Sequence, residues 1–155
     1  MGNMLSIDEV LQFAIRIEER GHEFYARQAA LREGPVADLL RRLAHDESQH
    51  KATFQKMLSG VASYQPSGAY PDEYFLYLRS YADQTIFSDA AVKTLSETAP
   101  VREVLEFALA RELASITYYS EMRAFLSPEH HEQVEKIIAE ERSHFARLSA
   151  MKTSL

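Results

Sequence analysis

The sequence contains no cysteine. Disulfides, thiolate-based zinc sites and iron–sulfur clusters are therefore excluded, and any bound metal must be held by carboxylate, imidazole or water ligands. The default compartment for such a chain is cytoplasmic. Positive charge is also scarce, because 17 Lys and Arg stand against 23 Asp and Glu and give a formal net charge of −6. A nucleic-acid-binding protein usually has a basic face, so we expect no nucleic-acid partner.

Long apolar runs are absent as well. No stretch approaches the roughly 20 apolar residues of a membrane span, so we expect no membrane partner. Residues 1–6 lack the basic and apolar segments of a secretory signal. Of the 155 residues, 46% are hydrophobic and 26% are charged, which is typical of a globular protein with a core. We expect the chain to form a single domain, residues 1–155.

Strand-like alternation is missing too, and apolar residues recur instead at spacings of three and four, as on one face of a helix. The pattern predicts four long helices, over about residues 6–32, 35–59, 100–126 and 128–151. Ser6 and Ser127 are typical N-caps, and Gly34-Pro35 is typical of a break between two helices. Both breaks are short, so the helices on either side of each must form antiparallel hairpins, about 6–59 and 100–151.

A region of different character, residues 60–99, joins the two predicted hairpins. Its length is too great for a simple turn, so it predicts a crossover with short helical pieces, one of them over about 72–82. Its aromatic side chains could line a ligand pocket, but packing over the bundle or against a second subunit is favoured. The predicted fold is therefore an all-α four-helix bundle. The aromatic residues of the crossover are Tyr64, Tyr70, Tyr74, Phe75, Tyr77, Tyr81 and Phe87.

An internal repeat relates the two hairpins, because an offset of 94 residues, as from position 47 to position 141, superimposes similar residues. Each hairpin carries Glu-x-x-His on its second helix, where positions i and i+3 share a face. Each also carries one Glu and one Tyr at matching positions of its first helix. The matched pairs are Glu18 with Glu112, Tyr25 with Tyr119, Glu47 with Glu141, and His50 with His144.

The glutamates and histidines of this repeat continue the apolar rows of their helices and are predicted to point inward. Their acidic neighbours Glu19, Asp46 and Glu140 fall in polar rows and are predicted to face solvent. Residue counts from the two turns place the inward groups at one level. Four carboxylates in an apolar interior are costly, and two divalent cations would offset them charge for charge. Glutamate and histidine suit iron, manganese or zinc without choosing among them.

These motifs resemble those of the ferritin-like superfamily, and most of all its rubrerythrin-type di-iron domain, over nearly the whole chain. The resemblance implies a ferritin-like bundle that holds two metal ions, with iron the first choice and manganese or zinc as alternatives. For the two tyrosines, core packing with satisfied hydroxyls is an equal alternative to a role at the metals. By resemblance, Glu47 and Glu141 bridge the metals, Glu18, Glu112, His50 and His144 bind one metal each, and Tyr25 and Tyr119 orient ligand carboxylates.

The chain departs from rubrerythrins at two points. It lacks their Cys-rich rubredoxin domain, which supplies electrons, and Ser115 stands where they carry an additional carboxylate. The resemblance implies a homodimeric non-haem di-iron oxidoreductase that reduces hydrogen peroxide or O2, peroxidase- or ferroxidase-like, with electrons from an external donor protein or from Fe(II) itself. The alternatives are an iron-sequestering protein, a structural zinc-binding bundle without catalysis, and a metal-free interaction bundle.

Overall fold

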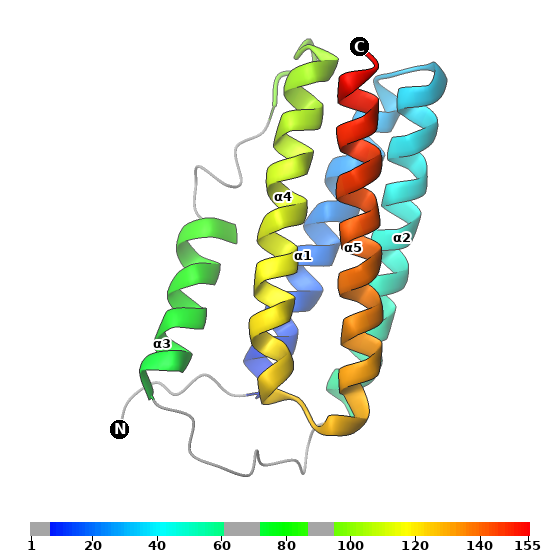
Figure 1. Ribbon diagram of the computed structural model, residues 1–155. Coiled ribbons are helices and arrows are strands. Elements are labelled where there is room, and N and C mark those ends of the chain that lie inside the picture. Colours follow the sequence, from blue (N-terminus) through cyan, green and yellow to red (C-terminus); the bar gives the residue numbers. More distant parts are fainter. Residues whose placement is uncertain (1–6, 61–71, 87–94) are drawn as a thin grey trace.

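The computed structural model describes residues 7–60, 72–86 and 95–155, and four long helices form a bundle (Figure 1). A shorter helix, α3 (Asp72–Tyr81), runs on into a π-helical turn over Ala82–Ile86, and a 3-10 turn over Arg123–Phe125 follows the third long helix. No strand occurs in these three described ranges, so the predicted all-α class is confirmed. The long helices are α1 (Ile7–Ala30), α2 (Gly34–Ser59), α4 (Val101–Met122) and α5 (Pro128–Thr153).

The four long helices pair as two antiparallel hairpins, α1 with α2 and α4 with α5 (Figure 1). Between α1 and α2, Gly34 has a φ of 71°, a left-handed conformation that residues with a Cβ rarely adopt, and Pro35 follows in the first turn. Ser127 is the N-cap of α5, but its hydroxyl lies 3.2 Å from Glu129 Oε1 and does not cap a backbone amide. The predicted cap Ser6 lies outside the described residues.

Two helices end earlier than the sequence predicts. α1 ends at Ala30 rather than near residue 32, and α4 ends at Met122 rather than near residue 126. In both places the chain continues with i→i+3 hydrogen bonds, from Arg32 N–H to Ala29 O at 3.2 Å and from Leu126 N–H to Arg123 O at 3.1 Å. Such bonds tighten the last turn while side chains keep nearly the same direction, so periodicity does not reveal the change.

The described part of the crossover packs on the bundle. Helix α3 lies beside α4 (Figure 1), and Leu78 and Ala82 are buried in the core. The Tyr81 hydroxyl donates to Ala114 O of α4 at 3.1 Å. The short helix predicted over about 72–82 is thus present. Of the other crossover aromatics only the Tyr77 side chain is described, and it is exposed.

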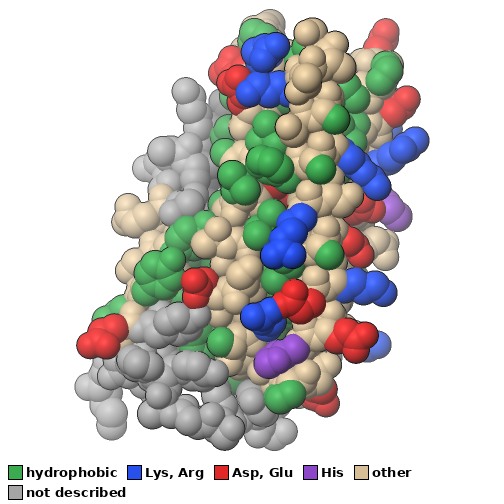
Figure 2. Space-filling model, in the orientation of Figure 1, with side chains coloured by type: hydrophobic (Ala, Val, Ile, Leu, Met, Phe, Trp, Pro, Cys, Tyr) green, Lys and Arg blue, Asp and Glu red, His purple; other side chains and the backbone are tan. Residues whose placement is uncertain are grey.

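In the described residues, the two larger of three buried apolar clusters fill the bundle, one toward each end. The cluster near the start of α1 includes Leu11, Phe54 and Val134, and the cluster near the α1–α2 turn includes Leu40 and Leu105. On the face shown in Figure 2, acidic and basic side chains are interspersed, and apolar side chains gather toward α3. Among the described helices, none is both long and apolar enough to cross a membrane.

Candidate metal centre

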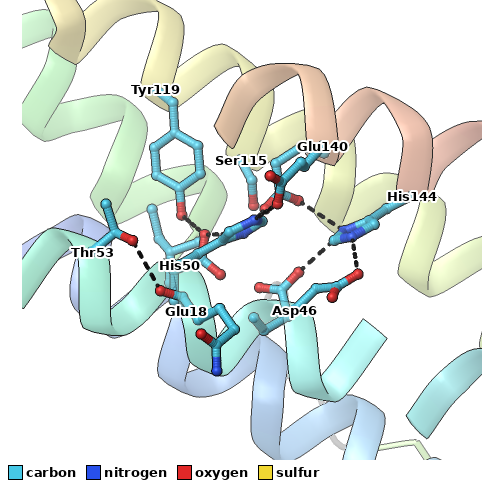
Figure 3. Close-up of polar contacts among 12 residues, drawn as sticks. Glu18, Asp46, His50, Thr53, Ser115, Tyr119, Glu140 and His144 are labelled. Atoms are coloured by element: carbon cyan, nitrogen blue, oxygen red, sulfur yellow. Dashed lines mark hydrogen bonds and ion pairs between the residues drawn. The ribbon is translucent and has the colours of Figure 1, made fainter. Parts of the chain in front are cut away.

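The six predicted ligands meet in the interior at the middle of the bundle, on the level that separates the two apolar clusters. Glu18, His50 and His144 of this group are labelled in Figure 3. Helices α1 and α4 each supply one carboxylate, and α2 and α5 each supply a carboxylate and an imidazole. None of the six residues is more than 4% exposed. All six residues that the helical rows predicted to point inward are therefore buried and close together. They are Glu18, Glu47, His50, Glu112, Glu141 and His144.

The six residues fall into two overlapping sets of four, each able to surround one cation. Within each set the candidate ligand atoms lie within 4.8 Å of one another. Both sets contain Glu47 and Glu141. One set adds Glu18 and His50, and the other adds Glu112 and His144.

The two imidazoles face the shared carboxylates with their Nδ1 atoms. Nδ1 of His50 lies 2.8 Å from Glu141 Oε1 and 3.5 Å from Glu18 Oε1. Nδ1 of His144 lies 3.6 Å from Glu141 Oε2 and 3.7 Å from Glu47 Oε1. The rings stack at a centroid distance of 5.8 Å. Each ring thus points one nitrogen into the cluster.

Both predicted tyrosines donate hydrogen bonds to the cluster, and each bond crosses between the hairpins. The Tyr25 hydroxyl on α1 lies 2.5 Å from Glu112 Oε1, and the Tyr119 hydroxyl on α4 lies 2.6 Å from Glu18 Oε1. Burial and the neighbouring carboxylates raise the pKa of both phenols well above its usual value, so they stay protonated. These bonds favour an orienting role for the tyrosines over plain core packing.

Two carboxylates of the site, Asp46 and Glu140, were not predicted to belong to it. They lie at the solvent-facing rim, as their polar rows predict, with side chains 35% and 50% exposed. Each nevertheless reaches across to the opposite hairpin, where Glu140 Oε2 lies 2.6 Å from His50 Nε2 and Asp46 Oδ2 lies 3.0 Å from His144 Nε2 (Figure 3). A carboxylate on Nε2 holds the proton there and leaves Nδ1 free to bind a metal.

The repeat contained the signal that would have found these two residues, because positions 46 and 140 are related by the same offset of 94 as the ligands. Glu19, the third acidic residue that was predicted to face solvent, does so and pairs with Lys51 at 3.3 Å.

The carboxylates strongly perturb one another's ionisation. Burial, Glu47 and Glu141 raise the pKa of Glu18 well above its usual value, and burial and Glu141 raise the pKa of Glu112 to about 8. Burial by itself would lower the pKa of His50, but hydrogen bonds to Glu141 and Glu18 raise it to about 12. Burial would also lower the pKa of His144, but the nearby carboxylates of Glu112, Glu141 and Glu47 raise it. The cluster therefore favours positive charge, whether protons or metal ions.

The donor set and its unsatisfied atoms fit a pair of divalent cations. Buried polar atoms without a hydrogen bond are rare and costly. In the described part of the chain, four such atoms belong to the predicted ligands, namely Oε2 of Glu18, Glu112 and Glu141 and Nδ1 of His144. A cation within each set of four would satisfy these atoms and offset the carboxylate charge.

Comparison with known proteins agrees with this geometry. The family model described as Rubrerythrin matches residues 9–152. The chain belongs to the rubrerythrin family. This rubrerythrin-family chain is also similar to a crystal structure of a ferritin-like diiron-carboxylate protein from Thermotoga maritima, with a TM-score of 0.71 and 25% sequence identity over 99% of this chain and 98% of that one. No curated protein matches it in sequence. The predicted family and ferritin-like fold are confirmed.

One position beside the centre departs from the pattern expected of rubrerythrins. Ser115 is buried, one helical turn after Glu112, and its hydroxyl donates to Arg111 O at 3.0 Å (Figure 3). It therefore adds no charge to the cluster. Its repeat mate on α1 is Gly21, so neither hairpin of this rubrerythrin-family protein carries a further carboxylate at that position.

Proposed function

We propose that this protein is a non-haem di-iron oxidoreductase that reduces hydrogen peroxide or O2 at the centre formed by its six buried ligands. The observation that carries the proposal is the pair of overlapping ligand sets that share Glu47 and Glu141. Membership of the rubrerythrin family and the likeness to a ferritin-like diiron-carboxylate protein support iron as the metal.

In this proposal Glu47 and Glu141 would be shared by two iron ions, Glu18 and His50 would help to hold one of them, and Glu112 and His144 would help to hold the other. When bound, two Fe(II) ions would supply two electrons, which together with two protons reduce hydrogen peroxide to two water molecules or O2 to hydrogen peroxide.

The chain's own residues hold this centre in place. Tyr25 and Tyr119 fix the carboxylates of Glu112 and Glu18 by hydrogen bonds, and the rim carboxylates hold the Nε2 protons of the histidines. The apolar clusters at both ends restrain access of solvent.

Electrons must come from outside the chain in this proposal. Without cysteine the sequence can hold no thiolate-bound iron–sulfur donor of its own. The donor is an external protein, or Fe(II) itself in a ferroxidase-like reaction. A cytoplasmic homodimer is part of the same proposal.

Two variants test the proposed activity directly. Glu47→Ala and Glu141→Ala each remove a shared ligand, so iron-dependent turnover of hydrogen peroxide or O2 should fall to background in both, as followed by peroxide or O2 consumption. The control is Glu19→Ala, whose carboxylate pairs with Lys51 away from the centre. Equal turnover in the wild type and both ligand variants contradicts the proposal.

A binding role without catalysis is the second candidate, and Ser115 favours it because this position, one helical turn after Glu112, carries no carboxylate. Metal analysis and an anaerobic Fe(II) titration separate the two. Two irons per chain that are oxidised repeatedly when peroxide and a reductant are added indicate the enzyme. Iron retained after one oxidation indicates sequestration, and tightly held zinc indicates a structural site.

A further inference from the structure

We propose that Gly21 is a positioning residue for Glu47 and makes the two shared carboxylates unequal. The inference rests on metal binding by the centre, which is part of the proposed function, but it requires neither iron nor turnover. It starts from contacts of Gly21, a residue of α1 that is buried one helical turn after Glu18.

The space beside the Gly21 Cα is occupied by the Glu47 carboxylate. A Cβ built on Gly21 would lie 2.6 Å from Glu47 Oε2 and 3.1 Å from Glu47 Cδ. The third near atom, Arg111 Nη2, would lie 3.4 Å away, which is an ordinary contact. An added methyl group would therefore leave Arg111 in place and displace Glu47.

The related position in the other hairpin is filled. The offset of 94 that relates Glu47 to Glu141 also relates Gly21 to Ser115. Ser115 has a Cβ, and its hydroxyl is held by Arg111 O at 3.0 Å. The position that the repeat relates to Gly21 thus carries a side chain, whereas Glu47 lies beside a glycine.

The two shared carboxylates also make different contacts, as expected if the carboxylate beside the glycine can move away from the cluster. Glu141 reaches both imidazoles, at 2.8 Å from His50 Nδ1 and 3.6 Å from His144 Nδ1. Among the described ion pairs Glu47 reaches His144 alone, at 3.7 Å, while its other oxygen is directed at Gly21. Glu47 is therefore drawn toward α1, into the space that the glycine leaves.

A methyl group at position 21 would push the Glu47 carboxylate toward the other glutamates. In chelator-treated protein this brings like charges together, whereas two divalent cations would attract the displaced carboxylate. Gly21→Ala should therefore destabilise the metal-free protein more than the metal-loaded protein. By linkage it should bind Co(II) more tightly than the wild type, by roughly tenfold if the displacement costs about as much as one hydrogen bond.

The experiment combines a Co(II) titration, followed by visible absorption and calorimetry, with thermal unfolding in chelator. Gly21→Ala is expected to raise the Co(II) affinity and to lower the chelator Tm. In a Glu47→Ala background the same change should instead raise the Tm, because no carboxylate is displaced and alanine favours the helix. Ser115→Ala, which keeps its Cβ and loses only the bond to Arg111 O, is the matched control and should bind Co(II) within about twofold of the wild type.

Three results would overturn the proposal. They are weaker or unchanged Co(II) binding in Gly21→Ala, an equal loss of Tm with and without Co(II), and a Tm that still falls in the Glu47→Ala background. If Gly21→Ala alone does not fold, recovery of folding by Glu47→Ala supports the proposal and failure to recover contradicts it. None of these measurements involves oxidation or turnover, so loss of the proposed enzymatic activity would leave this inference standing.

Discussion

The hairpin α1–α2 and the hairpin α4–α5 contribute the same ligand types at matched positions, yet they differ at the positions between those ligands. Phe24 of α1 packs on the Phe107 ring at a centroid distance of 5.0 Å, whereas its mate Tyr118 donates a hydrogen bond to Val10 O at 2.9 Å. Gly21 likewise faces a carboxylate where Ser115 bonds its own helix. The repeat thus preserves the ligand types, whereas the residues around the ligands differ and position them differently in each hairpin.

The comparison also shows how the two halves are joined. Contacts within each hairpin are more extensive than those between α1 and α4 or between α2 and α5. The hydrogen bonds of the centre instead connect the two hairpins. Both tyrosine bonds and both rim-carboxylate bonds cross from one hairpin to the other. We infer that bound metal ions strengthen the association of the two hairpins.

Removing the metal ions should have the largest effect on this association. A metal present at about a thousand times its Kd stabilises the folded state by about 4 kcal/mol, which for a chain of this size corresponds to a Tm shift on the order of 10 °C. Thermal unfolding with and without chelator measures it. A Tm that is the same in both conditions would show that the centre does not join the hairpins.

The pH dependence sharpens the same prediction. Burial and Glu141 raise the pKa of Glu112 from 4.5 to about 8, so between these values the folded state keeps a proton that the unfolded state has lost. Stability of the chelator-treated protein should therefore fall as the pH rises from about 5 to about 8. The raised pKa values of His50 and His144 act in the same direction above 6.5. Saturating metal should weaken this fall or reverse it, because the ligands release protons when they bind.

Glu112→Gln is the matched variant for this pH series. It cannot titrate, so in chelator its Tm should fall less between about pH 5 and about pH 8 than that of the wild type. If the wild-type Tm rises over this interval, or if the Tm of the variant falls as much as that of the wild type, Glu112 is not a source of the pH dependence.

Breaking one rim carboxylate at a time should separate the two metal positions. Glu140→Gln replaces the charged carboxylate acceptor of His50 Nε2 by a neutral amide, and Asp46→Asn does the same for His144 Nε2. Loss of such a partner typically weakens metal binding by about 10–100-fold, so each variant should weaken one step of a Co(II) titration and spare the other. Glu19→Gln is the control and should leave both steps unchanged. A uniform weakening of both steps would mean that the two positions are not held independently.

Helical periodicity was sufficient to predict the fold and the six inward groups. A residue in an apolar row, such as Glu18 or Glu112, is buried by the same packing that buries the row, so its direction is encoded locally. The rim carboxylates Asp46 and Glu140 could not be predicted in this way, because a row gives the direction of the Cα–Cβ bond and not how far a flexible side chain reaches across to another helix.

The contact between Gly21 and Glu47 could not be predicted from the sequence for a related reason. A glycine in an apolar row suggests close packing, but which atom approaches it depends on the relative height of two helices. The structure identifies that atom as an oxygen of Glu47. The early ends of α1 and α4 were missed because turns with i→i+3 hydrogen bonds continue the side-chain pattern of the helix before them.

The smallest expected effect compares three buried tyrosines. Tyr25→Phe and Tyr119→Phe each remove one hydrogen bond to a ligand carboxylate, which should cost about 1 kcal/mol and weaken Co(II) binding several-fold. Tyr118→Phe also removes one buried hydrogen bond, but its acceptor is Val10 O and its repeat mate is already Phe24. It should therefore lower the Tm by a similar amount while the Co(II) affinity stays the same. If all three variants change Tm and affinity alike, Tyr25 and Tyr119 only fill the core, and the crossed hydrogen bonds do not orient the ligands.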